Sequence, residues 1–144
     1  MTNMFSAKKM TISQNQLKEL KAAAIEVSKH SYSPYSKFSV GAAALTDSGH
    51  IVTGCNVENA SYGLTICAER NAIFHAVSSL GAITIVAIAI YTPTERPSTP
   101  CGACRQVIFE LGSSAEIYCF CSNEKIISTN IKNLLPDAFG KDSL

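Results

Sequence analysis

The sequence predicts a three-layer α/β/α sandwich built on a mixed β-sheet of about five strands. Helical and strand-like segments alternate along the chain, and one strand-like segment, residues 83–91, is apolar at nearly every position. At 144 residues the chain is long enough for one hydrophobic core. We therefore expect a single domain over residues 1–144, of which residues 1–12 form a loose N-terminal leader.

The first predicted elements are a helix and a β-hairpin. Apolar side chains recur at helical spacing over residues 14–30, behind the N-cap candidate Ser13. Residues 38–45 and 51–55 are apolar or β-branched, and Asp47-Ser48-Gly49 between them is a turn signal. These two segments are expected to pair as adjacent antiparallel strands.

Two further helices are predicted on either side of a central strand. Residues 67–80 have helical periodicity and end at Gly81, and residues 102–111 end at Gly112. Between them, residues 83–91 have the composition of a strand that is buried on both faces. This segment should lie at the centre of the sheet.

The last part of the chain predicts two strands and a short helix. The strands are expected at residues 115–121 and 125–129, and the helix at residues 131–135 before Pro136. Both cysteine-bearing helix starts follow loops near the central strands of this arrangement.

The composition points to a small, nearly neutral substrate and to an oligomer. The net charge is +1 and no stretch clusters basic residues, so no nucleic-acid partner is expected. Charged residues make up 16% of the chain, against roughly 25% in a typical soluble domain. Few charges are left to cover a monomer, so other subunits are expected to cover part of the surface.

The sequence predicts a cytoplasmic protein without a membrane anchor. The longest apolar run, residues 82–91, is about half the length of a membrane-spanning helix, and the N-terminus lacks the apolar core of a signal peptide. The six cysteines would be reduced in the cytoplasm, so they are interpreted as metal ligands or core residues. Cys55, Cys119 and Cys121 are expected to be small core residues.

Two cysteine motifs predict a zinc site, Cys67-Ala68-Glu69 and Pro100-Cys101-Gly102-Ala103-Cys104. Cys101 and Cys104 are three residues apart, so both sulfurs can project to the same side of a helix start. Structural zinc sites normally use four protein ligands, whereas catalytic sites use three and keep the fourth position for water. We expect one Zn²⁺ per chain, held by Cys67, Cys101 and Cys104.

Glu69 is the expected catalytic residue. A carboxylate beside a zinc-activated water can accept its proton and return it to the substrate. Three thiolates leave the zinc centre with a net negative charge, which makes it a poor Lewis acid. Arg70 and the two helix N-termini are expected to offset that charge.

These motifs resemble those of a known family. A ligand-x-Glu followed by Pro-Cys-x-x-Cys is the signature of zinc-dependent nucleobase deaminases. With Tyr35-Ser36-Lys37-Phe38-Ser39-Val40-Gly41-Ala42-Ala43 and Gly54-Cys55-Asn56-Val57-Glu58-Asn59-Ala60, the chain resembles the small homotetrameric zinc-dependent cytidine deaminases from about residue 32 to residue 139. The resemblance implies hydrolytic deamination of cytidine and deoxycytidine to uridine and deoxyuridine, with release of ammonia, in pyrimidine salvage.

The resemblance also implies how a nucleoside is bound. Asn56 and Glu58 would hydrogen-bond the ribose hydroxyls, and Phe38 would pack against the nucleoside. Ala68 would offer its backbone N–H to the pyrimidine carbonyl. The implied assembly is a homotetramer with shared active sites, in which Tyr62 lies near a subunit contact and Phe139 reaches into a neighbour's site.

The sequence departs from the common family pattern at two places. Asn71 stands where a small or hydroxylated residue is frequent, and residues 119–125 lack the usual glycine-bearing turn. The second departure weakens the prediction of a hairpin there.

Three alternatives remain beside this interpretation. A deaminase of a related aminopyrimidine nucleoside, of the blasticidin type, is disfavoured by the pair Asn56 and Glu58. A polynucleotide-editing deaminase is disfavoured by the absence of a basic, aromatic-rich stripe. A non-catalytic structural zinc module would require a fourth protein ligand. The preference between cytidine and deoxycytidine does not follow from these motifs.

Overall fold

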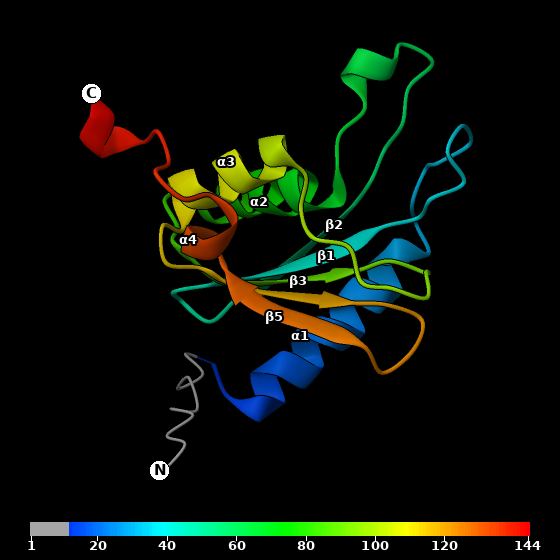
Figure 1. Cartoon of the computed structure of the whole chain (residues 1–144), viewed down its shortest axis with the longest axis horizontal. Coiled ribbons are helices and arrows are strands. Elements are labelled where there is room, and N and C mark those ends of the chain that lie inside the picture. The colour runs from blue at the N-terminus through cyan, green and yellow to red at the C-terminus, as the bar shows by residue number, and fades with distance from the viewer. Residues whose placement is uncertain (1–11) are drawn as a thin grey trace, which may run out of the picture.

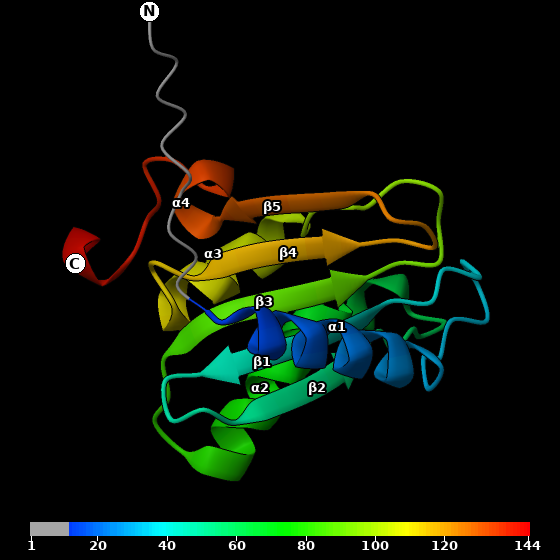
Figure 2. The same ribbon diagram turned by 90° about the horizontal axis from the view of Figure 1, so that it is seen from below.

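Five strands form one mixed sheet between two layers of helices (Figure 1). The computed structural model describes residues 12–144. The elements are α1 (Gln14–Ser28), β1 (Gly41–Thr46), β2 (Ile51–Cys55), η1 (Tyr62–Leu64), α2 (Ala68–Leu80), β3 (Ile85–Tyr91), α3 (Gly102–Leu111), β4 (Glu116–Phe120), β5 (Ile126–Asn130), α4 (Ile131–Leu134) and η2 (Lys141–Ser143). Helix α1 covers one face of the sheet, and α2 and α3 cover the other (Figure 2). The predicted α/β/α sandwich is confirmed.

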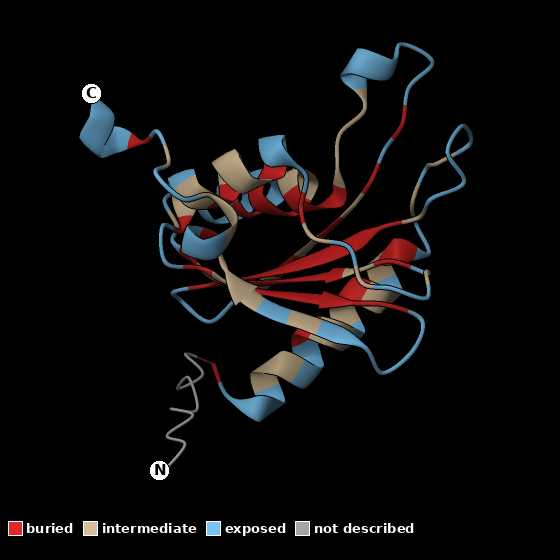
Figure 3. Cartoon of the chain, viewed as in Figure 1, coloured by how far each residue is buried: buried red, intermediate tan, exposed pale blue. Residues whose placement is uncertain are grey.

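The sheet has the strand order β2-β1-β3-β4-β5, so β3 is central as predicted. Strand β1 is antiparallel to both β2 and β3, β3 is parallel to β4, and β4 is antiparallel to β5. Strands β1, β3 and β4 are the most completely buried part of the sheet (Figure 3). Alternate residues of β3 face opposite layers, with Ile88 and Ile90 in the core beneath α2 and α3, and Ala87 and Ala89 beneath α1.

The predicted helices and strands are all present, and the differences lie at their ends. Helix α1 begins with a capping box in which Gln16 N donates to Ser13 Oγ at 3.1 Å. The first hairpin strand begins at Gly41 rather than residue 38, because the Asn56 side chain forms hydrogen bonds with the backbone just before Gly41. Its Nδ2 donates to Phe38 O at 2.7 Å, and its Oδ1 accepts from Val40 N at 2.9 Å.

The β4–β5 hairpin forms without a glycine in its turn. Asn123 supplies the missing contacts, since its Oδ1 accepts from Lys125 N at 2.9 Å and its Nδ2 donates to Glu95 O at 2.9 Å. An Asx side chain that bonds the backbone two residues ahead can replace a glycine turn. The sequence predicts a hairpin here despite the missing glycine, and the structure confirms that hairpin.

Four strand ends meet at one edge of the sheet. The register places Gly41 opposite both Cys55 and Tyr91, and Tyr91 opposite Phe120. The loop before β1 and the loops after β2, β3 and β4 therefore gather at this edge. In open α/β sheets, ligands bind outside the carboxyl ends of the parallel strands, which here are β3 and β4.

The N-terminal leader predicted for residues 1–12 falls outside the described residues except for Ile12. That residue is 5% exposed and belongs to the core beneath α1. No helix within residues 12–144 has the length and hydrophobicity needed to cross a lipid bilayer.

Candidate active site

A cavity of about 230 Å³ opens at the sheet edge where these loops meet. The predicted site residues that line it are Phe38, Asn56, Glu58, Cys67, Ala68, Glu69 and Cys101. A second hollow of about 320 Å³ lies between the end of α3 and Lys141, but none of the described residues that line it is a cysteine or histidine. The chemistry therefore points to the first cavity.

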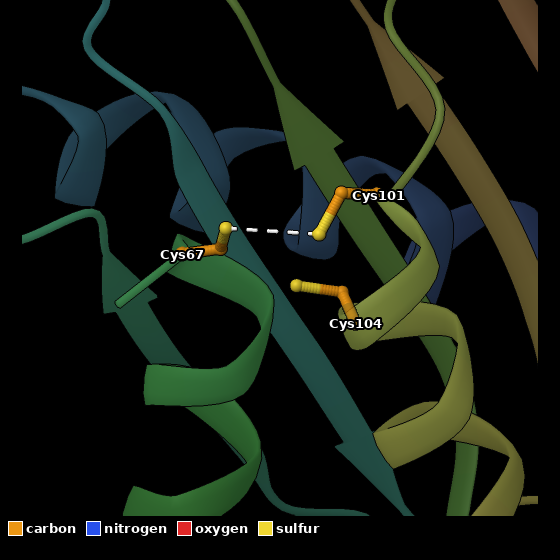
Figure 4. A group of neighbouring side chains, drawn as sticks. All are labelled: Cys67, Cys101 and Cys104. Carbon is orange, nitrogen blue, oxygen red and sulfur yellow. Dashed lines mark hydrogen bonds between the residues drawn. The ribbon is translucent and has the colours of Figure 1, made fainter. Parts of the chain in front are cut away.

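The three predicted zinc ligands lie together at the starts of two helices. Cys67 is the N-cap residue of α2, Cys101 is the N-cap residue of α3, and Cys104 lies one turn further into α3. Their sulfurs all lie within 4.8 Å of one another, and Cys67 Sγ is 3.9 Å from Cys101 Sγ (Figure 4). Neither N-cap cysteine uses its side chain to cap its helix, so both sulfurs remain available as ligands.

This geometry fits zinc. A Zn–S bond of about 2.3 Å in a tetrahedral site places two sulfurs roughly 3.8 Å apart, close to the separation of Cys67 and Cys101. Within residues 12–144 these cysteines are the only cluster of metal-ligating side chains, and no fourth member joins them. The donor set therefore leaves one coordination position open, as in catalytic zinc sites.

Positive charge surrounds the three sulfurs. The sulfurs lie at two helix N-termini, and Arg70 Nη2 donates to Cys67 Sγ at 3.4 Å. Hydrogen bonds from the Cys104 thiol and from Arg70 together lower the pKa of Cys67 to about 5, although burial acts in the opposite direction. The hydrogen bond to Cys67 raises the pKa of Cys104. These contacts favour the thiolate form of Cys67, which is the form that binds zinc.

Glu69 lies on the cavity wall beside the sulfurs. It is the second residue of α2 and is 5% exposed. Burial raises the pKa of Glu69 to about 7, and the negative charge of Cys67 adds to this effect. A carboxyl group with a pKa near neutrality can both accept and donate a proton at physiological pH.

Asn56 and Glu58 follow β2, line the same cavity as Cys67 and Cys101, and are each 8% exposed. Besides its bonds to residues 38 and 40, Asn56 accepts from Ser31 Oγ, which leaves one N–H of its amide unused. Glu58 Oε2 accepts from Tyr35 N at 2.9 Å and from Ser36 N at 3.2 Å, and Glu58 Oε1 accepts from Ser36 Oγ. These bonds to Ser36 and Tyr35 lower the pKa of Glu58.

Two residues that were not predicted to belong to the site connect β2, which leads to Asn56, with α2, which carries Glu69. Gly54 in β2 lies directly against the first turns of α2, where a Cβ would come within 2.3 Å of Ala72 N and 2.7 Å of Ala68 O. Asn71 Nδ2 donates to Cys55 O at 2.8 Å, next to Asn56. The only signals in the sequence were the place of Gly54 in a motif and the unusual residue at position 71.

The remaining predicted residues occupy different surroundings. Phe38 lines the cavity and is 38% exposed, and Ala68 is the first residue of α2, so its N–H has no acceptor within the helix. Tyr62 is 75% exposed and meets Tyr35 edge-on, with ring centroids 5.8 Å apart. Phe139 is 61% exposed, and neither Tyr62 nor Phe139 is among the residues that line the cavity of its own chain.

Comparison with known proteins identifies the family of this chain. The family model of the cytidine and deoxycytidylate deaminase zinc-binding region matches residues 14–121. The chain belongs to the cytidine deaminase family. The cytidine deaminase of Sporosarcina psychrophila is 45% identical over 129 residues, which cover 89% of this chain and 94% of that protein. A cytidine deaminase of Halalkalibacterium halodurans is 46% identical over 122 residues, covering 84% of this chain and 92% of the relative.

Solved structures of cytidine deaminases have the same fold. The crystal structure of cytidine deaminase from Burkholderia pseudomallei superposes with a TM-score of 0.81 at 43% identity, over 89% of this chain and 100% of that chain. The enzyme from Mycobacterium tuberculosis gives a TM-score of 0.76 at 42% identity, over 86% of this chain and 97% of that chain. The family assignment and the zinc-binding region thus cover the elements that carry the three cysteines.

Proposed function

We propose that this protein hydrolyses cytidine and deoxycytidine to uridine and deoxyuridine, with release of ammonia, in pyrimidine salvage. One observation carries the proposal. A buried carboxyl group, Glu69, lies beside three convergent thiols in a cavity that also contains the hydrogen-bonding pair Asn56 and Glu58. The cysteines and Glu69 supply the means of hydrolysis, and the polar pair supplies the means to hold a sugar.

The proposed metal ligands are Cys67, Cys101 and Cys104. When bound there, zinc supplies a Lewis acid that lowers the pKa of a water molecule toward neutrality. Arg70 keeps the sulfurs acidic by donating to Cys67, and the two helix N-termini add partial positive charge. These groups offset the negative charge of three thiolates.

Glu69 is proposed to move two protons. It first accepts a proton from the attacking water and gives it to ring N3, while the water oxygen bonds to C4. It then takes the remaining proton of the hydroxyl group now bonded to C4 and transfers it to the amino group, so that the C4–N bond breaks, the C4 carbonyl forms and ammonia leaves. A pKa of about 7, raised by burial, suits both roles at neutral pH.

The nucleoside is proposed to bind through the chain's remaining hydrogen-bonding groups. The unused N–H of Asn56 can donate to a ribose hydroxyl oxygen. Glu58 accepts three hydrogen bonds from Tyr35 and Ser36, and a carboxylate has about four acceptor positions, so one remains for the hydroxyl proton. The Ala68 N–H can donate to the pyrimidine carbonyl, and Phe38 can pack against the nucleoside.

The charge of the cavity favours a nucleoside over a nucleotide. Within residues 12–144 no lysine or arginine lines it, whereas Glu58 and Glu69 both do. A 5′-phosphate would therefore meet carboxylates without a cation to pair with it. We expect cytidine to be converted far more efficiently than cytidine 5′-monophosphate.

We further propose a homotetramer with shared active sites. Several large apolar side chains are exposed in the isolated chain: Tyr62, Leu64, Phe74, Val77 and Phe139. Their burial by neighbouring subunits would also explain why only 16% of residues are charged. Phe139 would enter a neighbour's cavity, since it does not reach its own. Sedimentation should give a species of four chains, and a fully active monomer would refute this assembly.

We propose a cytoplasmic location because the site depends on reduced thiols. All six cysteines are free in the structure, and the cytoplasm keeps thiols reduced. Fractionation of cells that express the protein should recover it with cytoplasmic markers, and recovery in a secreted fraction would contradict this.

The proposed activity is tested by measuring zinc per chain together with ammonia release from cytidine and deoxycytidine. One zinc per chain with release of ammonia and uridine is the expected result. Bound zinc without turnover of any aminopyrimidine nucleoside would favour a structural zinc module. Turnover of blasticidin-type nucleosides but not cytidine would favour the related deaminase.

A further inference from the structure

The side chain of Arg105 folds back from α3 onto the loop that precedes the helix. Its Nε donates to Pro100 O at 2.7 Å, and its Nη2 donates to Thr99 Oγ1 at 3.0 Å. A third donor, Nη1, reaches Leu134 O at the end of α4, at 3.0 Å. One planar guanidinium group thus connects α3 with the loop before it and with the end of α4.

The first two contacts lie at the metal site. Pro100 is fully buried and directly precedes Cys101, and Thr99 lines the cavity. The Pro100 carbonyl belongs to the peptide group that joins Pro100 to Cys101, so holding it restrains the backbone from which the Cys101 sulfur projects. Arg105 therefore holds the backbone of a proposed zinc ligand and a part of the cavity wall at the same time.

Helix stability does not explain a cation at this position. Arg105 is in the first turn of α3, where the helix dipole disfavours positive charge. It also follows Cys104 directly, so its backbone is fixed by the same helix that presents two of the three sulfurs. The cation is stabilised instead by the two carbonyl oxygens and the hydroxyl group that it contacts.

The third contact extends the same arrangement to the C-terminal residues. Leu134 is the last residue of α4, and the neighbouring side chain on α3, Gln106, donates through Nε2 to Phe139 O at 2.9 Å. Two adjacent side chains that follow Cys104 thus fix both ends of residues 134–139. The loop that carries Cys101 and the segment that carries Phe139 share one support.

We infer that Arg105 is a positioning residue of the metal site, which fixes Thr99 and Pro100 so that the Cys101 sulfur and the cavity wall keep their places. The inference rests on the proposed zinc site, and its kinetic consequences rest on the proposed function. Removal of the guanidinium group should loosen the metal site and the cavity wall together.

The test compares Arg105→Ala and Arg105→Lys with a matched control, Glu110→Ala, at the exposed far end of the same helix. Zinc-loaded proteins are mixed with a chromogenic zinc chelator, and the rate of zinc release is followed. Contacts of this kind typically affect metal affinity by about 10–100-fold, so Arg105→Ala should release zinc at least about tenfold faster than wild type. Arg105→Lys should recover only part of this loss, because an ammonium group cannot contact all three acceptors.

A double-mutant cycle shows whether the effect passes through Thr99. Thr99→Val removes one acceptor and retains the side-chain size, and it remains informative if Arg105→Ala fails to fold. The combined variant Arg105→Ala/Thr99→Val should release zinc more slowly than the product of the two single effects predicts. Absorption of the cobalt-substituted variants reports whether the three sulfurs still bind in tetrahedral geometry.

Kinetics supply a separate readout. If the wall moves, KM for cytidine should rise in Arg105→Ala more than kcat falls. Zinc release and KM equal to those of wild type in Arg105→Ala, or in Thr99→Val if the first variant does not fold, would overturn the inference. A lack of deaminase activity in wild type would refute the proposed function and leave the zinc-release comparison valid.

Discussion

Gly54 lies so close to Ala72 that a Cβ at Gly54 would come within 2.3 Å of the Ala72 nitrogen. This contact sets strand β2 against the first turns of α2. It therefore fixes the distance between the end of β2, which leads to Asn56, and the start of α2, which carries Glu69.

Gly54→Ala should force α2 away from β2, because the obstructing atoms belong to the backbone. Overpacking of this kind costs about 1–3 kcal/mol in stability, and a shift of the catalytic groups of about 1 Å can cost roughly 100-fold in rate. Denaturant unfolding and kcat/KM for cytidine measure the two effects. The control is Gly63→Ala, since a Cβ there meets nothing within 4 Å in the chain. Wild-type kcat/KM in Gly54→Ala would show that this spacing is unimportant.

Glu58→Gln should weaken nucleoside binding through the ribose. A hydrogen bond to a charged group contributes about 1.5–3 kcal/mol, so KM for cytidine should rise about 10-fold to 100-fold. We assign the 3′-hydroxyl as the partner of Glu58, because cytidine and deoxycytidine both carry it on the sugar ring. The sharper comparison therefore uses 3′-deoxycytidine, which lacks it. With wild type, KM for 3′-deoxycytidine should be higher than KM for cytidine, and this difference should largely disappear in Glu58→Gln. If the loss of the hydroxyl raises KM by the same factor in both proteins, Glu58 does not bond to that hydroxyl.

Cys119 predicts a dependence of stability on pH at alkaline values. Burial raises the pKa of Cys119 from 9.0 to about 12. Between those values the unfolded chain loses this proton and the folded chain keeps it, so the free energy of unfolding falls as pH rises. The loss is about 1.4 kcal/mol per pH unit.

Cys119→Val removes this titration and nearly preserves the side-chain volume. Denaturant unfolding of zinc-loaded wild type and variant between pH 7 and pH 10 should therefore show a shallower loss of stability for the variant above about pH 9. Parallel curves for the two proteins would mean that the Cys119 thiol titrates alike in the folded and unfolded chain.

Removal of zinc should destabilise the fold as well as stop turnover. The ligands join the starts of α2 and α3, so metal bound only by the folded chain adds to its stability. At a zinc concentration of about 100 times Kd the gain is roughly 2.7 kcal/mol, which corresponds to a fall in melting temperature of about 10 °C on chelation. Zinc should restore both properties and magnesium neither. An unchanged melting temperature after verified zinc loss would argue against this link.

The sequence predicts the family and the cysteine cluster of this protein, because both are indicated by short motifs of fixed spacing. Cys67, Cys101 and Cys104 lie at helix starts where their spacing indicates, and the ends of the predicted helices and strands differ by only a few residues. The late start of β1 could not be foreseen, since it depends on the Asn56 side chain bonding to residues 38 and 40.

The residues that sequence reasoning missed act across long separations in the chain. Gly54 matters because α2 packs against it, and Arg105 matters because Leu134 lies beside it in the folded protein. Neither contact leaves a periodicity or a motif spacing that a single sequence reveals. In contrast, the sequence shows that residues 119–125 contain no glycine, but it does not show that the Asn123 side chain stabilises the turn instead.

Glu69 is proposed to move protons at a zinc centre without holding the metal. The most direct measurement is zinc content and ammonia release from cytidine for wild type and Glu69→Gln, prepared side by side. We expect one zinc per chain in both proteins, with turnover in wild type and nearly none in the variant, because only the proton carrier is removed. A variant that binds zinc and still releases ammonia at a rate near that of wild type would contradict this role of Glu69.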